Sequence, residues 1–199
     1  LGMTIEIEVL LERLRDLHRS NKTSRQKSLI TFDDGWSDVL LIPKDFFLNH
    51  SSLQPVVFLT DEQLQGHPRW MPLHALYDWM EREGHTLEQL AQLGIDRGAI
   101  KDLREQEQHT FISQQQGLTD RIPNYLTRSD LEALTHIGWR FASHGPEHSD
   151  LRTLPLVELR TMLEGSLQLL QDLGAEPWLA WPEGRWNDEV ATLASEGGF

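Results

Sequence analysis

The sequence predicts an α/β fold built around a parallel sheet or barrel. Four short apolar segments have the length and composition of buried strands: residues 28–32, 55–60, 139–143 and 178–181. Helical segments separate them, and strands that alternate with helices are typical of parallel sheets. Polar or proline-containing turns follow three of these strands directly, at Asp33, His144 and Pro182. Because functional residues gather where parallel strands end, we expect the three turns at one edge of the sheet.

The first half of the chain is predicted to hold two helices beside its strands. Residues 5–18 place leucine and isoleucine side chains on one helical stripe. The polar stretch 19–27 is expected to end that helix. A second helix is predicted over residues 38–49, where Pro43 must lie near the start or kink the helix.

A mostly helical insertion is predicted after the second strand, over residues 61–127. Three stretches within it show partial helical periodicity: residues 70–83, 86–93 and 100–116. Trp70 and Trp79 are expected in the core of this insertion, because large aromatic side chains bury a large apolar area.

Two further helices are predicted in the second half. Ser129 and Glu132 have the spacing of a capping box, so a helix should begin beside them. Residues 155–173 show the clearest helical periodicity, with Pro155 in the first turn and Gly174 after the last.

Composition limits the classes of partner. The 199 residues suffice for one sizeable core, and 18 lysines and arginines against 31 aspartates and glutamates leave a net charge of −13. This acidic balance argues against nucleic acid and against anionic membranes, whereas neutral or cationic partners are compatible with it. No apolar run has the length of a membrane span. Because the sequence contains no cysteine, a metal would have to bind histidine, aspartate or glutamate.

Two groups of side chains stand out as candidates for chemistry. Asp33 and Asp34 are adjacent carboxylates followed by Gly35, and they would repel each other unless a cation or strong donors compensate. Taken alone, this motif favours an ordinary turn with a helix cap. His144 and His148 have an i, i+4 spacing that can direct two imidazoles at one ion, although two surface histidines in a polar loop would look the same.

Together the two groups indicate a hydrolytic metal site. Two histidines and one carboxylate supply three protein ligands and leave one coordination position open, as in catalytic zinc sites. The same ligand set occurs in ferrous oxygenases. A second carboxylate beside a metal-bound water favours hydrolysis.

Three motifs resemble, in order, those of the polysaccharide deacetylases, carbohydrate esterase family 4 with its NodB-homology domain. They are residues 31–35 (TFDDG), 143–151 (SHGPEHSDL) and 180–185 (AWPEGR). The resemblance implies a deformed (β/α) barrel. It also implies one catalytic domain over residues 1–199, enlarged by the insertion at 61–127. Family members continue beyond a Gly-Phe such as the last two residues, so the chain is expected to be incomplete at its C-terminus.

The resemblance also implies roles for individual residues. Asp33 would be the catalytic base, and Asp34, His144 and His148 would bind Zn²⁺ or another divalent metal such as Co²⁺, Ni²⁺ or Mn²⁺. The expected substrate is an N-acetylated polysaccharide or oligosaccharide, whose acetyl group a metal-activated water removes. The proline loop is expected to bind substrate and the oxyanion, the latter through the backbone N–H of Glu183. The substrate-binding residues implied by position are Trp181, Pro182, Glu183, Gly184 and Trp36.

Three positions depart from the family pattern. Gly145 stands where serine or threonine is frequent, and Ala180 stands where many members have an arginine that orients the base. Glu183 replaces a usual aromatic residue and would favour a cationic, partly deacetylated polymer. Trp186 is a further candidate for stacking on a sugar ring.

Two alternative functions stay open at this point. An O-acetyl esterase of the xylan type would use the same metal and water, and a non-catalytic glycan-binding domain would retain the metal site alone. The other seven histidines are expected at the surface or in packing contacts: His18, His50, His67, His74, His85, His109 and His136. Family members usually act in the periplasm, at the cell surface or outside the cell, which implies an extracytoplasmic location. The sequence does not indicate an oligomeric state.

Overall fold

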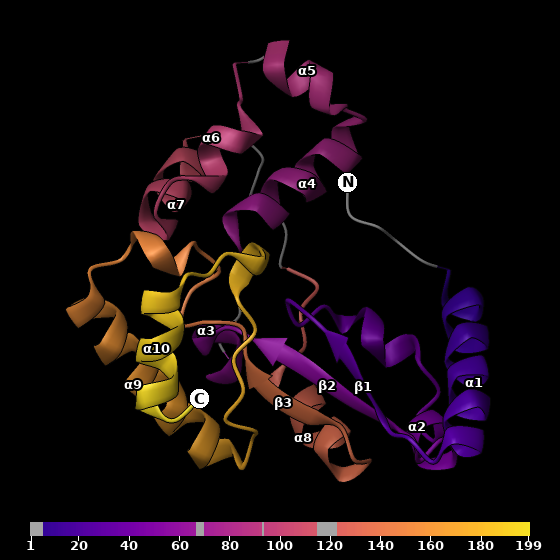
Figure 1. Cartoon of the computed structure of the whole chain (residues 1–199). Helices are drawn as coiled ribbons and strands as arrows, with labels where there is room; N and C mark the ends of the chain where they lie inside the picture. Colours follow the sequence, from indigo (N-terminus) through magenta and orange to yellow (C-terminus); the bar gives the residue numbers. More distant parts are fainter. Residues whose placement is uncertain (1–5, 67–69, 93, 115–122) are drawn as a thin grey trace.

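A three-stranded parallel sheet lies at the centre of the protein (Figure 1). The computed structural model describes residues 6–66, 70–92, 94–114 and 123–199. The sheet has the order β1-β2-β3, and its strands are β1 (Ser28–Phe32), β2 (Leu53–Leu59) and β3 (Arg140–Ser143). Three of the four predicted strands are therefore confirmed as strands, as is the α/β class with a parallel sheet. The prediction that residues 28–32 form a buried strand is wrong in one respect, because the residues of β1 alternate between half-buried and exposed.

The register brings the carboxyl ends of the strands to one edge. Phe32 pairs with Val57 across β1 and β2, and Leu59 pairs with Ser143 across β2 and β3. Asp33 and His144 each follow the last residue of a strand. The prediction that these two turns share one edge of the sheet is confirmed.

The predicted fourth strand at residues 178–181 is wrong as a full strand. Leu179 forms only an isolated parallel bridge with Ser143. The Ser143 N–H donates to the Trp178 carbonyl, and the Ala180 N–H donates to the Ser143 carbonyl. The turn that begins at Pro182 then leads the chain away, so the described residues form an open sheet and not a closed barrel.

Helices cover one face of the sheet. The main apolar cluster joins β2 and β3 to α1 (Ile7–Ser24), α2 (Phe46–Asn49) and α8 (Arg128–His136). The other face is smaller and buries Val56 and Phe58 of β2 beneath Trp178. The sheet therefore separates a large core from a smaller one.

Helix α1 is longer than predicted, because part of the polar stretch 19–27 continues it to Ser24. Asn21 is buried in that stretch and donates to Ser28 Oγ at 3.0 Å. The helix ends at Arg25, whose φ of 57° is left-handed. A polar residue whose side chain hydrogen-bonds to the sheet, as that of Asn21 does, can continue a helix.

The single helix predicted over residues 38–49 is also wrong. A 3₁₀ helix, η1 (Ser37–Leu41), precedes Pro43, and α2 follows it. Proline lacks an N–H and clashes with the preceding turn, which accounts for the break.

The insertion after β2 is helical, as predicted, and has an apolar cluster of its own. Its helices are α3 (Asp61–Leu64), α4 (Pro72–Glu83), α5 (Leu87–Gln92), α6 (Arg97–Lys101) and α7 (Glu105–Ser113). Trp70 is buried in this cluster and Trp79 packs against it, as expected. The stretch 100–116, which showed partial helical periodicity, contains the end of α6 at Lys101 and then α7. Residues 67–69, 93 and 115–122 of the expected insertion lie outside the described residues.

The insertion helices α4 to α7 form a lobe beyond the sheet (Figure 1). Helices α9 (Leu156–Leu173) and α10 (Asp188–Gly197) pack against each other beside the sheet. Within the described ranges, no helix combines the length and the apolar character that crossing a membrane requires.

The starts of the later helices differ from the prediction in detail. The capping box of α8 is formed by Thr127 and Asp130, not by Ser129 and Glu132. Pro155 is the N-cap of α9 and precedes its first turn, while Gly174 ends the helix in a left-handed conformation as predicted. Helix α10 has no counterpart in the prediction, and its N-cap Asn187 accepts from the Val190 N–H.

Candidate metal centre

The turn after β1 holds Asp34 in an unusual backbone conformation. Both Asp34 and Gly35 have positive φ angles, 66° and 65°. A Cβ on Gly35 would lie 2.4 Å from Leu59 Cδ2, so only glycine fits there. The turn therefore needs glycine for two reasons, its left-handed backbone and its close approach to β2.

A buried glutamine fastens this turn to the next strand. Gln63 Nε2 donates to the Asp34 carbonyl oxygen at 2.7 Å. Gln63 Oε1 accepts from the Thr60 N–H at 3.0 Å, where Thr60 begins α3. Gln63 is 2% exposed, so neither bond competes with bulk water. The orientation of the Asp34 backbone is thereby fixed from the end of β2.

The end of the insertion also pairs with the turn. The Leu126 N–H donates to the Gly35 carbonyl at 2.8 Å, and Trp36 and Tyr125 form an antiparallel bridge. The Asp34 turn is thus held by Gln63 and by Leu126, both of which are distant from it in the sequence.

The loop after β3 is held just as closely. The His144 N–H donates to the Leu59 carbonyl at 2.7 Å. On the ring, His144 Nδ1 lies 3.0 Å from the Ala180 carbonyl, to which an Nδ1–H donates. This bond leaves Nε2 to face Asp34 and selects the tautomer suited to bind a metal.

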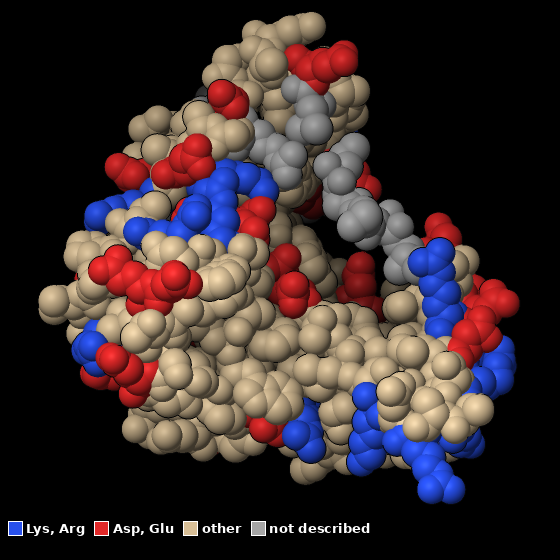
Figure 2. Space-filling view, in the orientation of Figure 1, with Lys and Arg blue, Asp and Glu red and all other residues tan. Residues whose placement is uncertain are grey.

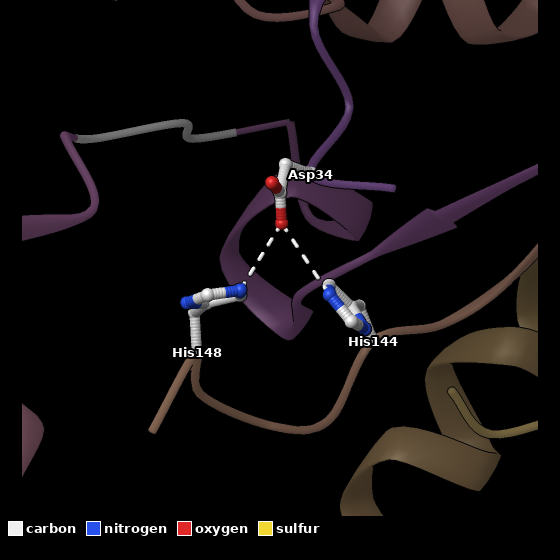
Figure 3. A group of neighbouring side chains, drawn as sticks. All are labelled: Asp34, His144 and His148. Carbon is white, nitrogen blue, oxygen red and sulfur yellow. Dashed lines mark ion pairs between the residues drawn. The ribbon is translucent and has the colours of Figure 1, made fainter. Parts of the chain in front are cut away.

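Asp34, His144 and His148 meet around one oxygen atom (Figure 3). Asp34 Oδ1 is 3.4 Å from His144 Nε2 and 3.1 Å from His148 Nε2. One candidate ligand atom from each residue lies within 4.8 Å of the others. The side chains are 21%, 5% and 10% exposed for Asp34, His144 and His148.

The electrostatics of this group favour a charged carboxylate. Burial alone would raise the pKa of Asp34, but the imidazoles of His144, His148 and His74 hold that pKa well below its usual range. Burial would likewise lower the pKa of His144, whereas the adjacent Asp34 carboxylate raises it overall. The carboxylate therefore stays ionised and depends on nearby positive charge.

These residues fit a divalent cation. Asp34 Oδ1 is buried and has no hydrogen-bond partner among the described residues, and two imidazole nitrogens converge on it. An orphaned buried carboxylate oxygen is costly unless a cation or donor compensates it. Two imidazoles and one carboxylate form a donor set suited to zinc and similar metals.

His74 is the residue of this site that sequence reasoning missed. It lies in α4 of the insertion, and its Nε2 is 3.3 Å from Asp34 Oδ2. The expectation that His74 lies at the surface or serves only packing is wrong. No spacing could reveal it, because the insertion places it beside Asp34 from 40 positions further along the chain.

The remaining predicted site residues outside the proline loop differ in how exposed they are. Asp33 is exposed, and its charge contributes to the raised pKa of His144. Trp36 is half-buried against the insertion, with its ring 4.8 Å from that of His74. Trp186 is 53% exposed and free of such packing in the described structure.

The proline loop lies against the histidine loop. A Cβ on Gly145 would be 3.2 Å from Pro182 Cγ, so Pro182 lies directly beside the residue that follows His144. Trp181 packs partly into the cluster between α9 and α10, and Gly184 is exposed. The loop is thus part of the same edge of the sheet as predicted.

Ion pairs join the proline loop to the insertion. Glu183, whose φ is 55°, pairs with Lys101 of α6, and Arg185 pairs with Asp102 at 2.9 Å. The Glu183 carboxylate is therefore engaged by a cation of this chain, which removes the basis for assigning it to a cationic polymer.

A cavity of about 270 Å³ lies beside the candidate metal ligand His148. Its wall combines apolar side chains with acidic ones: Thr60, Asp61, Glu62, Gln63, Trp70, Met71, Pro146, Glu147, His148, Met162 and Gly165. Figure 2 shows the surface hollowed between the insertion and the sheet, with acidic side chains in the hollow. The candidate metal centre is therefore bordered by a partly acidic surface.

Asp61 of this cavity should make stability depend on pH. Burial raises the pKa of its carboxyl to about 6, opposed by the Ser166 hydroxyl and reinforced by the charge of Glu147. Because this pKa exceeds the unfolded value of 3.8, the stabilisation is full below pH 3.8 and is lost as pH rises through about 6. Relative to Asp61→Asn, the wild-type protein should lose about 2 kcal/mol of unfolding free energy between pH 4.5 and 7.5. Urea unfolding of both proteins at the two pH values measures this, and a constant difference would contradict it.

Comparison with known proteins identifies the family of this chain. The sequence profile of the polysaccharide deacetylases, described as "Polysaccharide deacetylase", matches residues 20–199. No curated protein matches the sequence at a significant level. Among solved structures, the Streptococcus pyogenes deacetylase PplD in complex with acetate is similar at 15% identity with a TM-score of 0.49. That match covers 93% of this chain and 60% of PplD, so the chain spans less than two thirds of its length. The profile match over most of its residues places this chain in the polysaccharide deacetylase family.

Proposed function

We propose that this chain removes acetyl groups from N-acetylated sugars of a polysaccharide, using water and a divalent metal ion. One observation carries the proposal. Asp34 Oδ1 is buried, lacks a hydrogen bond within the described residues, and faces the Nε2 atoms of His144 and His148. Membership of a deacetylase family supports the reaction type.

Each residue has a distinct task in this reaction. Asp34, His144 and His148 would hold the ion. When bound, the ion supplies a Lewis acid for the acetyl carbonyl and lowers the pKa of a water. Asp33 is exposed beside this group and would accept a proton from the attacking water. Overall, one water is added across the C–N bond, which yields acetate and an amine.

The proline loop would hold the developing oxyanion. By its position in the family motif, the backbone N–H of Glu183 is the donor that we assign to this task. The contact between Gly145 and Pro182 supports this assignment, because it places the loop directly beside the histidine ligands. Trp181, Pro182 and Gly184 of the same loop, together with Trp36, would form the substrate wall.

The deformed barrel is part of the same proposal. The single parallel bridge between Ser143 and Leu179 continues the sheet by one step beyond β3. Val56, Phe58 and Ala142 lie on the face that such a barrel would enclose. The bridge and the apolar side chains on that face support a barrel-like arrangement.

Metal content and acetate release together test the function. Purified protein should contain close to one divalent ion per chain, and it should release acetate from N-acetylglucosamine oligomers only while that ion is bound. Stripping the metal with a chelator and restoring zinc provides the control within one preparation. Absence of metal uptake, even with added zinc, would refute the site assignment.

The choice of substrate separates the alternatives in the same experiment. Release of acetate from acetylated xylan but not from N-acetylated oligomers would identify an O-acetyl esterase. Bound metal with no release from either polymer would identify a glycan-binding domain. Either result would contradict the N-deacetylase proposal and leave the metal site intact.

A further inference from the structure

The two oxygens of Asp34 have different neighbours. His144 and His148 approach Oδ1 at 3.4 and 3.1 Å, whereas His74 approaches Oδ2 at 3.3 Å. The closely spaced group of candidate ligands contains Asp34, His144 and His148 but not His74. One oxygen therefore faces the proposed metal position, and the other faces a histidine of the insertion.

The groups on both sides of His74 determine where its ring carries the proton. An ionised carboxylate can only accept, so the Nε2 that lies 3.3 Å from Asp34 Oδ2 carries the imidazole proton. Nδ1 is then an acceptor, and the buried Tyr125 hydroxyl, 2.7 Å away, donates to it. The Met71 N–H can only donate, and it lies 3.4 Å from Tyr125 Oη, which accepts from it.

We propose that His74 is a positioning residue for the metal carboxylate, a role that rests on the proposed metal site. Its Nε2–H donates to Asp34 Oδ2 and so turns Oδ1 toward His144 and His148. Groups that orient a metal ligand from behind fix its geometry, and their loss weakens metal affinity by about 10- to 100-fold. The relay runs from the Met71 N–H through Tyr125 and His74 to Asp34.

Packing within the insertion holds this relay in place. Leu73 and Ala75, the neighbours of His74 in α4, are buried in the apolar cluster of the insertion. The ring of Trp36 lies 4.8 Å from that of His74, and the Trp36 backbone bridges to Tyr125. The insertion thus supplies both His74 and Tyr125, which makes it a structural part of the metal centre.

Metal affinity of single variants tests the role without any enzyme assay. Dissociation constants for Co²⁺, with its visible absorption spectrum, would be measured for wild type, His74→Leu, His74→Gln and Tyr125→Phe. His74→Leu should bind Co²⁺ at least about 10-fold more weakly. His74→Gln should recover most of that loss, because its amide can donate from a similar position. Tyr125→Phe should lie between wild type and His74→Leu.

The spectrum and a matched control distinguish positioning from other roles. His85→Leu removes another histidine of the insertion, whose ring lies 4.7 Å from that of Trp79, and should leave affinity unchanged. The Co²⁺ spectrum of His74→Leu should keep its shape, since the ligands themselves are retained. A changed coordination spectrum would make His74 a ligand and overturn the positioning role.

Three further results would overturn the proposal. They are equal affinity of wild type and His74→Leu, no recovery in His74→Gln, or an equal loss in His85→Leu. Tyr125→Phe preserves the aromatic packing, so it decides the matter if His74→Leu does not fold. A wild-type protein that takes up no Co²⁺ would refute the metal site itself, and that failure is visible before any variant is made.

Discussion

Asp34→Ala should abolish tight binding of a divalent metal and, with it, all metal-dependent release of acetate. The Asp34 carboxylate is the group on which both histidines converge, so its loss leaves two imidazoles without the anionic ligand. Loss of a group that hydrogen-bonds to a metal ligand weakens metal affinity by about 10- to 100-fold. Loss of the ligand itself should therefore weaken metal affinity by more than about 100-fold. Titration with Zn²⁺ or Co²⁺ measures the loss directly.

Asp34→Asn is the control for backbone strain in that experiment. Asp34 has a φ of 66°, a conformation that alanine adopts at a cost and asparagine tolerates well. Asparagine also keeps the shape of the side chain while removing its charge. Metal binding at wild-type affinity by Asp34→Asn would show that the carboxylate is not a ligand.

Asp33→Asn should keep the metal and lose turnover. An asparagine in place of the base cannot accept a proton from water, and general base catalysis typically contributes about 10²- to 10⁴-fold to the rate. We therefore expect kcat to fall by about 10³-fold while the dissociation constant for the metal changes little. Because Asp33 is exposed, the substitution removes no buried contact.

The control for Asp33 is a nearby exposed carboxylate outside the site. Asp38 lies in η1 and contacts Asn124, so Asp38→Asn tests the effect of one lost negative charge on the same turn. Its kcat should stay close to that of wild type. Full turnover in Asp33→Asn would refute its assignment as the base.

Much of the sheet and the position of the candidate site could be predicted from local sequence. Residues 28–32 and 139–143 are short apolar runs that end at polar turns, and both form strands at those positions. The rule that parallel strands end at one edge then brings Asp34 near His144 and His148. The three motifs also led to the family, which the profile match confirms.

Local pattern was a weaker guide to where elements end. Helix α1 continues through polar residues because His18 and Asn21 are buried with partners, His18 contacting Ser52 Oγ at 2.7 Å. Residues 178–181 look like a strand, yet only Leu179 forms a bridge. In α1, contacts with distant residues outweighed the polarity of the residues themselves, whereas the turn that begins at Pro182 ends the apolar segment 178–181.

The sequence by itself determined the α/β class, the strands that precede the first two motifs, and a carboxylate and two histidines at one sheet edge. These features depend on short-range periodicity and on a general property of parallel sheets. Only the tertiary structure placed His74 and Tyr125 behind Asp34 and paired Glu183 with Lys101. Such contacts join residues dozens of positions apart, and their formation depends on how the insertion packs against the sheet edge, which no local spacing encodes.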